Sequence, residues 1–256
     1  MINSILNNIV NNKEKVSIKN KPFPYIIIDD ALPKEYYEEL DKSFPKYNKI
    51  INNLNYQPNF AYRYSALQSL NDWEIPEIWK EFIKYHTSYE FVHEVYKTFK
   101  ESVQKYYPDI KLPTKEDVGI RFSKKNYFDT DCQFVINTPT EKETSVIEPH
   151  LDNPKEFYAA LFYMRNKDDD STGGDLTSYS FKKDPIFYGK SRIKENNVNL
   201  VDAINYKENR VVIFLNTLFS AHGVTKKSIS PHYRKYINII GEFQSELFDF
   251  RKHLEN

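Results

Sequence analysis

The sequence predicts a mainly β fold with helices in its N-terminal part, folded as a single domain of 256 residues. Before Lys115 the apolar residues recur at helical spacing, whereas after it short β-branched or aromatic runs alternate with turn-forming residues. These later runs lie too close together for intervening helices, which favours antiparallel pairing in a sandwich or barrel. We therefore expect a helical buttress over residues 1–115 and a β core over residues 116–245.

The N-terminal part is expected to contain one strand followed by helices. Residues 22–29 form a β-branched run behind proline punctuation, and a helix should begin near Pro33. Residues 45–70 lack a clean period and are interpreted as irregular or weakly extended. Apolar positions repeat every three or four residues over 73–107, which predicts two helices or one bent helix ended by Pro108.

The C-terminal part is expected to be built from short strands. They are predicted at residues 118–122, 132–137, 145–147, 157–164, 176–180, 198–203, 211–215, 221–224 and 233–243. The stretch 181–207 is longer than a barrel connection needs, even with a short strand inside it, and is expected to be a lid or substrate insert. Gly173 and Gly174 should supply positive φ at a turn, and the acidic run before them, residues 168–170, should be a solvated turn.

Composition and charge narrow the classes of partner. Lysine plus arginine equals aspartate plus glutamate, 36 each, so no basic excess exists to hold a nucleic acid. No stretch of about eighteen apolar residues occurs, so no membrane partner is expected. Cys132 is the only cysteine, which excludes an internal disulfide and fits a reducing compartment. The N-terminus lacks the features of a secretory signal, and we expect a cytoplasmic protein.

Two histidines and one aspartate form a candidate metal site. His150 and Asp152 are two residues apart, so in a strand both side chains face one side. His222 follows the apolar run 211–215 and would lie near the end of another buried strand. Two histidines and one carboxylate leave several coordination positions open, which is the arrangement expected for non-haem ferrous oxygenases. Arg234, inside an apolar strand, needs a carboxylate partner, and a bidentate ligand carboxylate would satisfy it.

These residues carry a family resemblance. In order along the chain, Pro149-His-Leu-Asp152, Gly173-Gly-Asp-Leu176, Arg210-Val-Val-Ile-Phe214, Ala221-His-Gly-Val224 and Arg234 resemble the motifs of the 2-oxoglutarate- and iron(II)-dependent oxygenases, in their prolyl-4-hydroxylase-like branch. The N-terminal strand and helix resemble that branch too. The resemblance implies a double-stranded β-helix, a jelly-roll, cupin-like barrel over residues 116–245, buttressed by helices and with iron at its open mouth.

The resemblance also implies roles for single residues. His150, Asp152 and His222 would bind Fe²⁺, and Arg234 would pair with the far carboxylate of 2-oxoglutarate. Related halogenases replace the metal carboxylate by a small residue, so Asp152 favours hydroxylation. Prolyl hydroxylases usually have lysine where Arg234 stands, which points away from a typical protein-prolyl substrate. Further contacts to the cosubstrate are expected from Tyr236, Gln133 and Asn137, each of which could instead serve packing or structure.

The sequence thus predicts a dioxygenase that uses O₂ and 2-oxoglutarate to hydroxylate a carbon of a small molecule or an amino-acid side chain, with release of succinate and CO₂. One alternative is a catalytically silent jelly-roll that binds a carbohydrate or protein partner. Another is a cupin-type metal enzyme without 2-oxoglutarate. Two structural interpretations also stay open: Arg234 could be an ordinary ion-pair partner of Glu242, and Glu148 could face the metal cavity or solvent.

Overall fold

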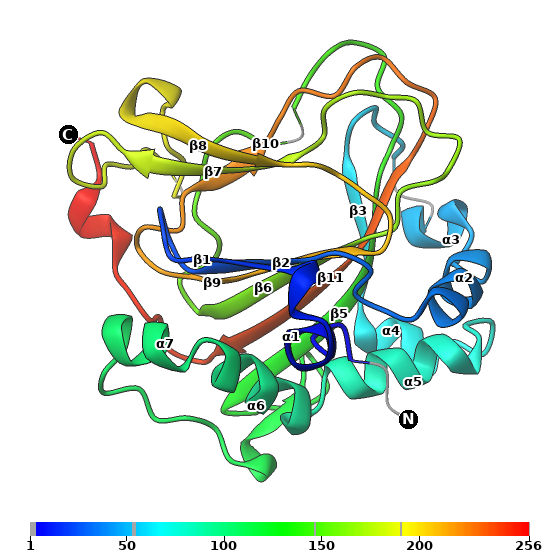
Figure 1. The fold of residues 1–256 in the computed structure, drawn as a ribbon, viewed down its shortest axis with the longest axis horizontal. Coiled ribbons are helices and arrows are strands. Elements are labelled where there is room, and N and C mark those ends of the chain that lie inside the picture. Colours follow the sequence, from blue (N-terminus) through cyan, green and yellow to red (C-terminus); the bar gives the residue numbers. More distant parts are fainter. Residues whose placement is uncertain (1–3, 53–54, 146, 190, 256) are drawn as a thin grey trace.

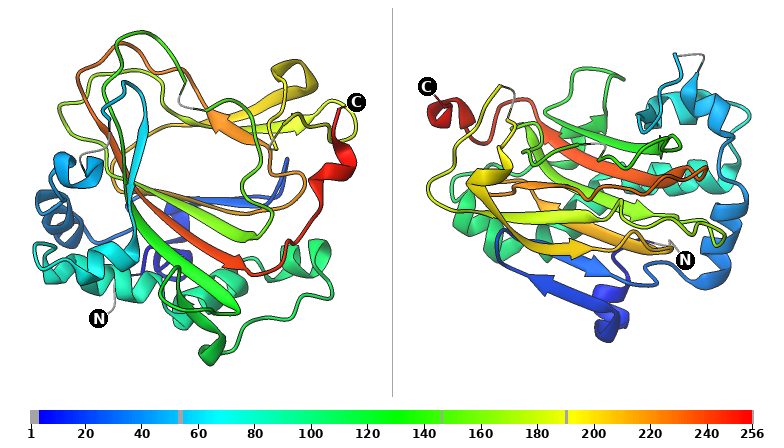
Figure 2. Two further views of the ribbon diagram at one scale, coloured as in Figure 1. Left: turned by 180° about the vertical axis from the view of Figure 1, so that it is seen from behind. Right: turned by 90° about the horizontal axis from the view of Figure 1, so that it is seen from above.

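Two facing β-sheets and a layer of helices make up the molecule, as seen in a computed structural model of the chain (Figure 1). It describes residues 4–52, 55–145, 147–189 and 191–255. Helices α4 to α7 cover the outer face of the larger sheet, and the smaller sheet lies across from its inner face (Figures 1 and 2). The fold is therefore mixed, and most strands follow the helices along the chain, as the sequence predicts. Three strands of the larger sheet, Val16–Lys19, Tyr25–Ile28 and Ala61–Tyr64, instead lie within the part expected to be a helical buttress.

The larger sheet has the strand order β1-β2-β9-β6-β11-β5-β3, and β4 pairs with β5 outside this path. All pairs along the path are antiparallel, whereas β4 runs parallel to β5. Its strands are β1 (Val16–Lys19), β2 (Tyr25–Ile28), β3 (Ala61–Tyr64), β4 (Val118–Ile120), β5 (Phe128–Asn137), β6 (Glu156–Tyr163), β9 (Arg210–Leu215) and β11 (Arg234–Phe243).

The smaller sheet has the order β10-β7-β8, from β7 (Leu176–Phe181), β8 (Val198–Ile204) and β10 (His222–Val224). Isolated bridges extend it, because Thr144 pairs with Lys227 and His150 pairs with His222. The predicted strand 145–147 is therefore replaced by bridges on either side of it, and residue 146 lies outside the described residues. Between β5 and β6 of the larger sheet the chain passes through Thr144 and His150, which are bridged beside the smaller sheet, and from β8 onward successive strands alternate between the two sheets.

The interior between the sheets is an apolar cluster with residues from both. Tyr163, Val212 and Phe214 from the larger sheet pack against Leu176 and Ile204 from the smaller one. Within the described part of the chain the strands form two separate hydrogen-bonded sheets, so the β core is not closed into the barrel expected from the resemblance. Each sheet instead buries one face against the other, which is the packing of a sandwich.

Helix α5 buries one apolar stripe against the outer face of the larger sheet. In α5 the buried residues Trp79, Phe82, Ile83 and His86 follow the three- and four-residue spacing of one helix face. Trp79 packs edge to face on Phe134 of β5. The α-helices are α1 (Asn8–Asn11), α2 (Lys34–Lys42), α3 (Tyr47–Ile51), α4 (Ala66–Asn71), α5 (Glu77–His86), α6 (Tyr89–Thr98) and α7 (Lys100–Tyr106), and short 3₁₀ turns cover Lys13–Lys15, Lys115–Asp117, Glu195–Asn197 and Phe250–His253.

Several predicted elements need correction. The segment 45–70, predicted to be irregular, contains α3, β3 and α4. Residues 73–107 form three helices, because the chain breaks at Thr87 and again at Phe99, where each residue leaves the α region. The helix predicted near Pro33 is confirmed as α2, and β1 and α1 were not predicted.

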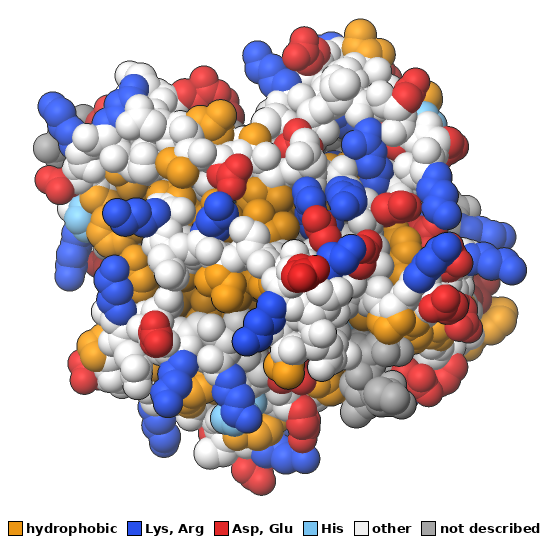
Figure 3. Space-filling view, in the orientation of Figure 1, with side chains coloured by type: hydrophobic (Ala, Val, Ile, Leu, Met, Phe, Trp, Pro, Cys, Tyr) orange, Lys and Arg blue, Asp and Glu red, His pale blue; other side chains and the backbone are white. Residues whose placement is uncertain are grey.

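The surface carries charges of both signs. Lysine and arginine side chains are interspersed with aspartate and glutamate across the face in Figure 3, in keeping with their equal numbers in the sequence. Among the helices described, none is long and apolar enough to span a bilayer.

Candidate active site

Three side chains from the smaller sheet and the segment beside it converge on one point. The Nε2 atom of His150 lies 3.6 Å from one oxygen of Asp152, and the Nε2 atom of His222 lies 3.5 Å from the other. One potential ligand atom from each residue lies within 4.8 Å of the others. The structure therefore brings together the three residues that the sequence nominated as metal ligands.

Backbone hydrogen bonds fix the position and tautomer of both histidines. The amide of His150 donates to the carbonyl of His222 at 2.9 Å, and the amide of His222 donates back at 3.1 Å. The Nδ1 atoms then donate to the carbonyls of Glu148, at 2.9 Å, and Ser220, at 2.8 Å. A neutral histidine that donates through Nδ1 presents the Nε2 lone pair, which is the form that binds a metal.

The three side chains also shift each other's protonation. Burial raises the pKa of Asp152, but the positive charge of His222 and the hydrogen bond from His150 outweigh it, so its pKa is lowered. Burial lowers the pKa of His222, but the Asp152 carboxylate outweighs this and its pKa is raised. The ionised Asp152 carboxylate therefore favours positive charge on the histidines beside it. A divalent cation bound between the three side chains could supply that positive charge in place of protons.

Arg234 is buried at 3% exposure and has spare hydrogen-bonding capacity. Its Nε donates to the carbonyl of Gly174 at 2.9 Å, whereas its Nη2 has no hydrogen-bond partner among the described residues. The guanidinium lies about 5 Å from the ring centres of Tyr163, Tyr206 and Tyr236. A buried guanidinium with an unsatisfied N–H group has a site for an anion beside it.

The alternative prediction that Arg234 forms an ion pair with Glu242 is wrong, because Glu242 pairs with Arg121 instead. The Glu242 carboxylate accepts two hydrogen bonds from Arg121, from Nε at 2.8 Å and from Nη2 at 2.6 Å. In the part of the chain that the structure describes, no carboxylate lies within ion-pair distance of Arg234.

One cavity of about 410 Å³ extends from the His150, Asp152 and His222 side chains to Arg234. Its floor is the inner face of the larger sheet, where alternate residues of β11 line it, and its roof comes from the smaller sheet. This volume is within the range of small-molecule sites. The lining residues are Asn59, Phe60, Ala61, Arg63, Arg121, Gln133, Asn137, Ile147, His150, Asp152, Glu156, Ala159, Leu161, Leu176, Phe214, His222, Val224, Arg234, Tyr236, Asn238 and Ile240.

The three further residues nominated from the sequence all line this cavity. Gln133 is held by its Nε2 group, which donates to the carboxylate of Asp131 at 2.7 Å. The Oδ1 atom of Asn137 is buried and lacks a partner among the described residues. Tyr236 places its ring 4.8 Å from the Arg234 guanidinium. Their positions fit contacts to a ligand, and their roles stay predictions.

Sequence reasoning missed Tyr163, which completes the wall around Arg234. Its hydroxyl is buried without a hydrogen-bond partner in the described chain, and burial raises its pKa to about 12, so the hydroxyl stays protonated at neutral pH. Tyr163, Leu161 and Ala159 are alternate residues of β6, so their side chains all face the interior between the sheets. This alternation in the sequence could have indicated that Tyr163 points toward the site.

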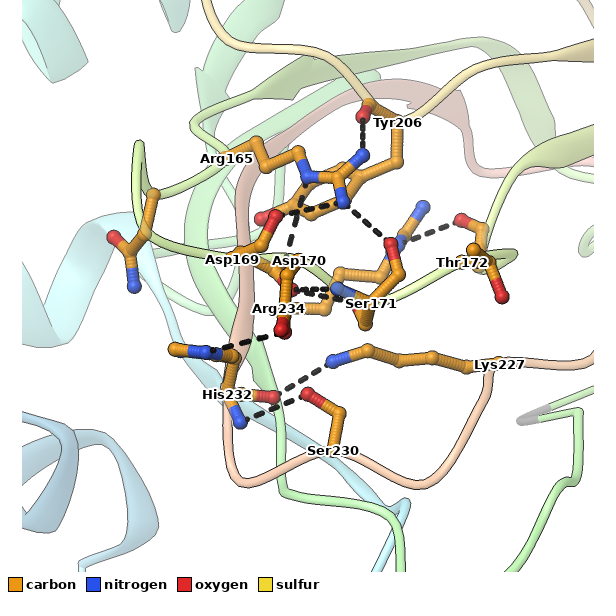
Figure 4. A network of polar contacts seen from close by, with 12 residues as sticks. Arg165, Asp169, Asp170, Ser171, Thr172, Tyr206, Lys227, Ser230, His232 and Arg234 are labelled. Carbon is orange, nitrogen blue, oxygen red and sulfur yellow. Dashed lines mark hydrogen bonds and ion pairs between the residues drawn. The ribbon is translucent and has the colours of Figure 1, made fainter.

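The acidic run before the glycines is only partly the solvated turn that was predicted. Asp170 is exposed, but Asp169 is buried and its Oδ1 accepts from the amide and hydroxyl of Ser171. Arg165 braces the same turn by donating to the carbonyls of Asp169, Ser171 and Tyr206, as Figure 4 shows. This network fixes the loop that leads to Gly174, and so fixes the carbonyl that orients Arg234.

Glu148 and the stretch 181–207 lie near the His150, Asp152 and His222 side chains but do not line the cavity. The Glu148 side chain is exposed and accepts a hydrogen bond from Tyr188 at 2.9 Å, so only its carbonyl serves the site. The stretch 181–207 includes β8, and its described residues do not line the cavity. Instead the amide of Ile193 donates to Pro149, and Arg192 bridges to His150. The stretch packs on the segment that carries His150 and Asp152, and its role as a lid stays a prediction.

Comparisons with known proteins give matches among solved structures alone. No family model and no curated protein matches the chain. A prolyl 4-hydroxylase from Phytophthora capsici is 17% identical, with a TM-score of 0.46, over 86% of this chain and 59% of that chain. A Trichoplax adhaerens prolyl hydroxylase, solved with a peptide fragment of hypoxia inducible factor, is 13% identical, with a TM-score of 0.48, over 86% and 84%. A Pseudomonas putida prolyl-4-hydroxylase is 10% identical, with a TM-score of 0.43, over 96% and 100%.

All three of these solved structures are described as prolyl hydroxylases. This chain spans 59% of the Phytophthora protein. At such identities and TM-scores the likeness does not establish an activity, which has to be argued from the residues of this chain.

Proposed function

We propose that this protein is an iron(II)- and 2-oxoglutarate-dependent oxygenase that hydroxylates a carbon of a small molecule or an amino-acid side chain. The observation that carries the proposal is one cavity with two features. A His-Asp-His cluster lies on one wall, and the buried Arg234 guanidinium, with its unpartnered Nη2, lies on another.

The three ligands fit ferrous iron. His150 and His222 offer neutral imidazole nitrogens and Asp152 offers an ionised carboxylate, all from one side. This two-histidine, one-carboxylate set leaves open positions toward the cavity, as in non-haem iron oxygenases. The backbone carbonyls that hold both Nδ1 atoms keep the ligands oriented.

The surroundings of Arg234 fit the distal carboxylate of 2-oxoglutarate. A carboxylate there would accept from the free Nη2 and from the hydroxyl of Tyr163, and so satisfy two buried donors that have no partner among the described residues. Three tyrosine rings around the guanidinium keep water away and strengthen this contact.

When bound, iron and 2-oxoglutarate would supply the oxidising power for hydroxylation, with succinate and CO₂ released. The chain's own residues would hold the metal ligands in one tautomer, anchor the cosubstrate and enclose the reaction in the cavity between the two sheets. Asp152 occupies the ligand position that would have to be vacant for halide binding, so we propose hydroxylation.

For the β core we propose a double-stranded β-helix, in a single domain over residues 1–256. From β5 to β11 the chain passes back and forth between the sheets, which supports a jelly-roll connectivity. The helices of residues 1–115 buttress the larger sheet.

Titration under anaerobic conditions, followed by exposure to oxygen, tests the proposal. We expect Fe²⁺ to bind with one equivalent, 2-oxoglutarate to bind the iron-loaded protein, and succinate to form when oxygen is admitted. His222→Gln should abolish iron binding, whereas His93→Gln, a helix histidine outside the cavity, should not. If the iron-loaded protein binds no 2-oxoglutarate, the alternative of a catalytically silent binding module would be favoured. Turnover that persists unchanged in Arg234→Met would support a metal enzyme without 2-oxoglutarate.

A further inference from the structure

The side-chain amide of Gln133 is held in one orientation on the cavity floor. Gln133 is 8% exposed and lines the cavity. Its Nε2 group donates to Oδ2 of Asp131 at 2.7 Å. Its Oε1 atom accepts no hydrogen bond from another described residue. The floor therefore presents a hydrogen-bond acceptor whose donor is missing.

Asp131 determines which end of this amide is left over. Its side chain is buried, and its Oδ1 accepts from the backbone amides of Ala66, at 2.8 Å, and Cys132, at 2.9 Å. Burial raises the pKa of the Asp131 carboxyl, but these two N–H donors and the Gln133 amide favour its ionised form. An ionised carboxylate only accepts hydrogen bonds, so the NH₂ group of Gln133 faces Asp131 and Oε1 stays free.

A second amide lies beside Gln133. Gln133 and Asn238 are paired positions on β5 and β11, so their Cβ atoms lie about 5 Å apart on the same face of the sheet. Asn238 lines the cavity, is half-buried, and its side chain makes no hydrogen bond with another described residue. Its amide is therefore free to turn its NH₂ group toward a ligand. The floor offers one fixed acceptor and one adjustable donor side by side.

The strand order places Gln133 beside the proposed cosubstrate space. Arg234 lies on β11 and Tyr163 on β6, and Phe214 on β9 has its ring centre 4.8 Å from that of His222. The proposed metal and cosubstrate contacts therefore come from β9, β6 and β11. Gln133 lies on β5, on the other side of β11 from β6, and the cavity continues past it to the edge strand β3. Gln133 thus faces the flank where a second ligand would lie.

The cosubstrates cannot satisfy Gln133. Both carboxylates and the keto group of 2-oxoglutarate only accept hydrogen bonds, and dioxygen brings no donor, so the donor for Oε1 has to come from the substrate. We propose that the substrate is a small molecule with an amide or lactam group, whose N–H donates to Oε1 of Gln133 and whose C=O accepts from Asn238. The inference rests on the proposed oxygenase function and names the substrate class of the same site. It assigns Gln133 to the substrate in place of the cosubstrate.

Matched pairs of small probes test this in the protein loaded with iron and 2-oxoglutarate, without oxygen. The probes are five- and six-membered lactams and the carboxamides of small aliphatic and aromatic acids. Each is compared with its lactone or methyl ester, which lacks the N–H donor and keeps the C=O. Ligand-observed NMR titration measures the affinities, and the paramagnetic iron broadens the signals of a probe bound in the cavity. We expect an amide to bind there roughly fivefold or more tightly than its ester, because the ester leaves Oε1 unsatisfied.

Asp131→Asn reverses the polarity of the contact with little change in shape. Its Oδ1 can still accept from the backbone amides, while its NH₂ group donates to Oε1 of Gln133 and turns the NH₂ group of Gln133 toward the cavity. The preference for amide over ester should be lost, with the 2-oxoglutarate affinity unchanged. Asp129→Asn, on the same strand, is the matched control and should keep the preference, since Asp129 accepts from Asn126 and Gln244 and does not line the cavity. Thermal unfolding verifies that both variants fold.

Two results would overturn the inference. One is that no amide of the panel binds in the cavity more tightly than its ester, which means that Gln133 binds only water. The other is that folded Asp131→Asn keeps the preference, which means that another group recognises the N–H. The titration with 2-oxoglutarate tests the proposed function separately, since the protein can bind 2-oxoglutarate and form succinate while every amide fails to bind.

Discussion

Replacing Arg234 by methionine separates a ligand-binding arginine from a structural one. Methionine keeps much of the side-chain volume and removes the charge. The guanidinium has one hydrogen bond, from Nε to Gly174, and one unpartnered group, Nη2. A hydrogen bond to a charged group contributes about 1.5–3 kcal/mol, and an unsatisfied buried donor costs about 1–3 kcal/mol. The two effects nearly cancel, so the free energy of unfolding of the ligand-free protein should change by less than about 1.5 kcal/mol.

The affinity for 2-oxoglutarate should respond very differently. A carboxylate at Arg234 accepts a charge-assisted hydrogen bond from Nη2, worth about 1.5–3 kcal/mol, whereas its hydrogen bond from Tyr163 remains in the variant. At about 1.4 kcal/mol for each factor of ten, the dissociation constant should rise roughly tenfold to a hundredfold. Calorimetry on the iron-loaded protein measures this, and urea unfolding measures the stability.

Arg210→Met is the matched control. Arg210 donates to both oxygens of Asp29, at 2.6 and 3.0 Å, and lies outside the cavity. Its loss should lower stability and leave the 2-oxoglutarate affinity unchanged. The reasoning is refuted if Arg234→Met behaves like this control, losing several kcal/mol of stability with no loss of affinity.

Three further predictions concern the metal, pH and the turn beside Arg234. Asp152→Asn should weaken Fe²⁺ binding by more than about a hundredfold in a metal titration, because the ligand loses its charge. Burial lowers the pKa of His86 from 6.5 to about 3, so the unfolded state binds an extra proton between these values. Stability should then fall by about 1.4 kcal/mol per pH unit as the pH drops from 6.5 toward 3, and His86→Gln should remove that slope in urea titrations. Gly173→Ala should cost more than about 2 kcal/mol in the same assay, since a Cβ would lie 1.8 Å from the Lys226 carbonyl at a φ of +75°, whereas Gly189→Ala, with nothing within 4 Å, should cost less.

The convergence of the candidate metal ligands could be predicted from the sequence because they lie in short motifs whose spacing has a direct geometric meaning. His150 and Asp152 are close in the chain, and His222 follows a strongly apolar strand, β9. Both predicted positive-φ glycines are confirmed, at +75° and +74°. Local chemistry was sufficient in each case.

Features that depend on distant pairing could not be predicted in the same way. Glu156 reaches the cavity because β6 begins there opposite a register shift at Gly241 and Glu242, which no local pattern reveals. The helix α4 is different, because Ser65 and Gln68 form a capping box that is visible in the sequence and was overlooked. The unexpected edge strand β3 then supplies Arg63 to the cavity.

The reciprocal backbone pairing of His150 and His222 has a consequence for how metal occupancy can be observed. His150 and His222 share a pair of main-chain hydrogen bonds beside the smaller sheet. A cation bound by both side chains would therefore also hold these two backbone segments together. Local opening of this pairing would require release of the metal, and its free energy should rise with metal concentration. The exchange of these two amide protons with solvent should therefore slow when iron binds, and report occupancy without a substrate or a turnover assay.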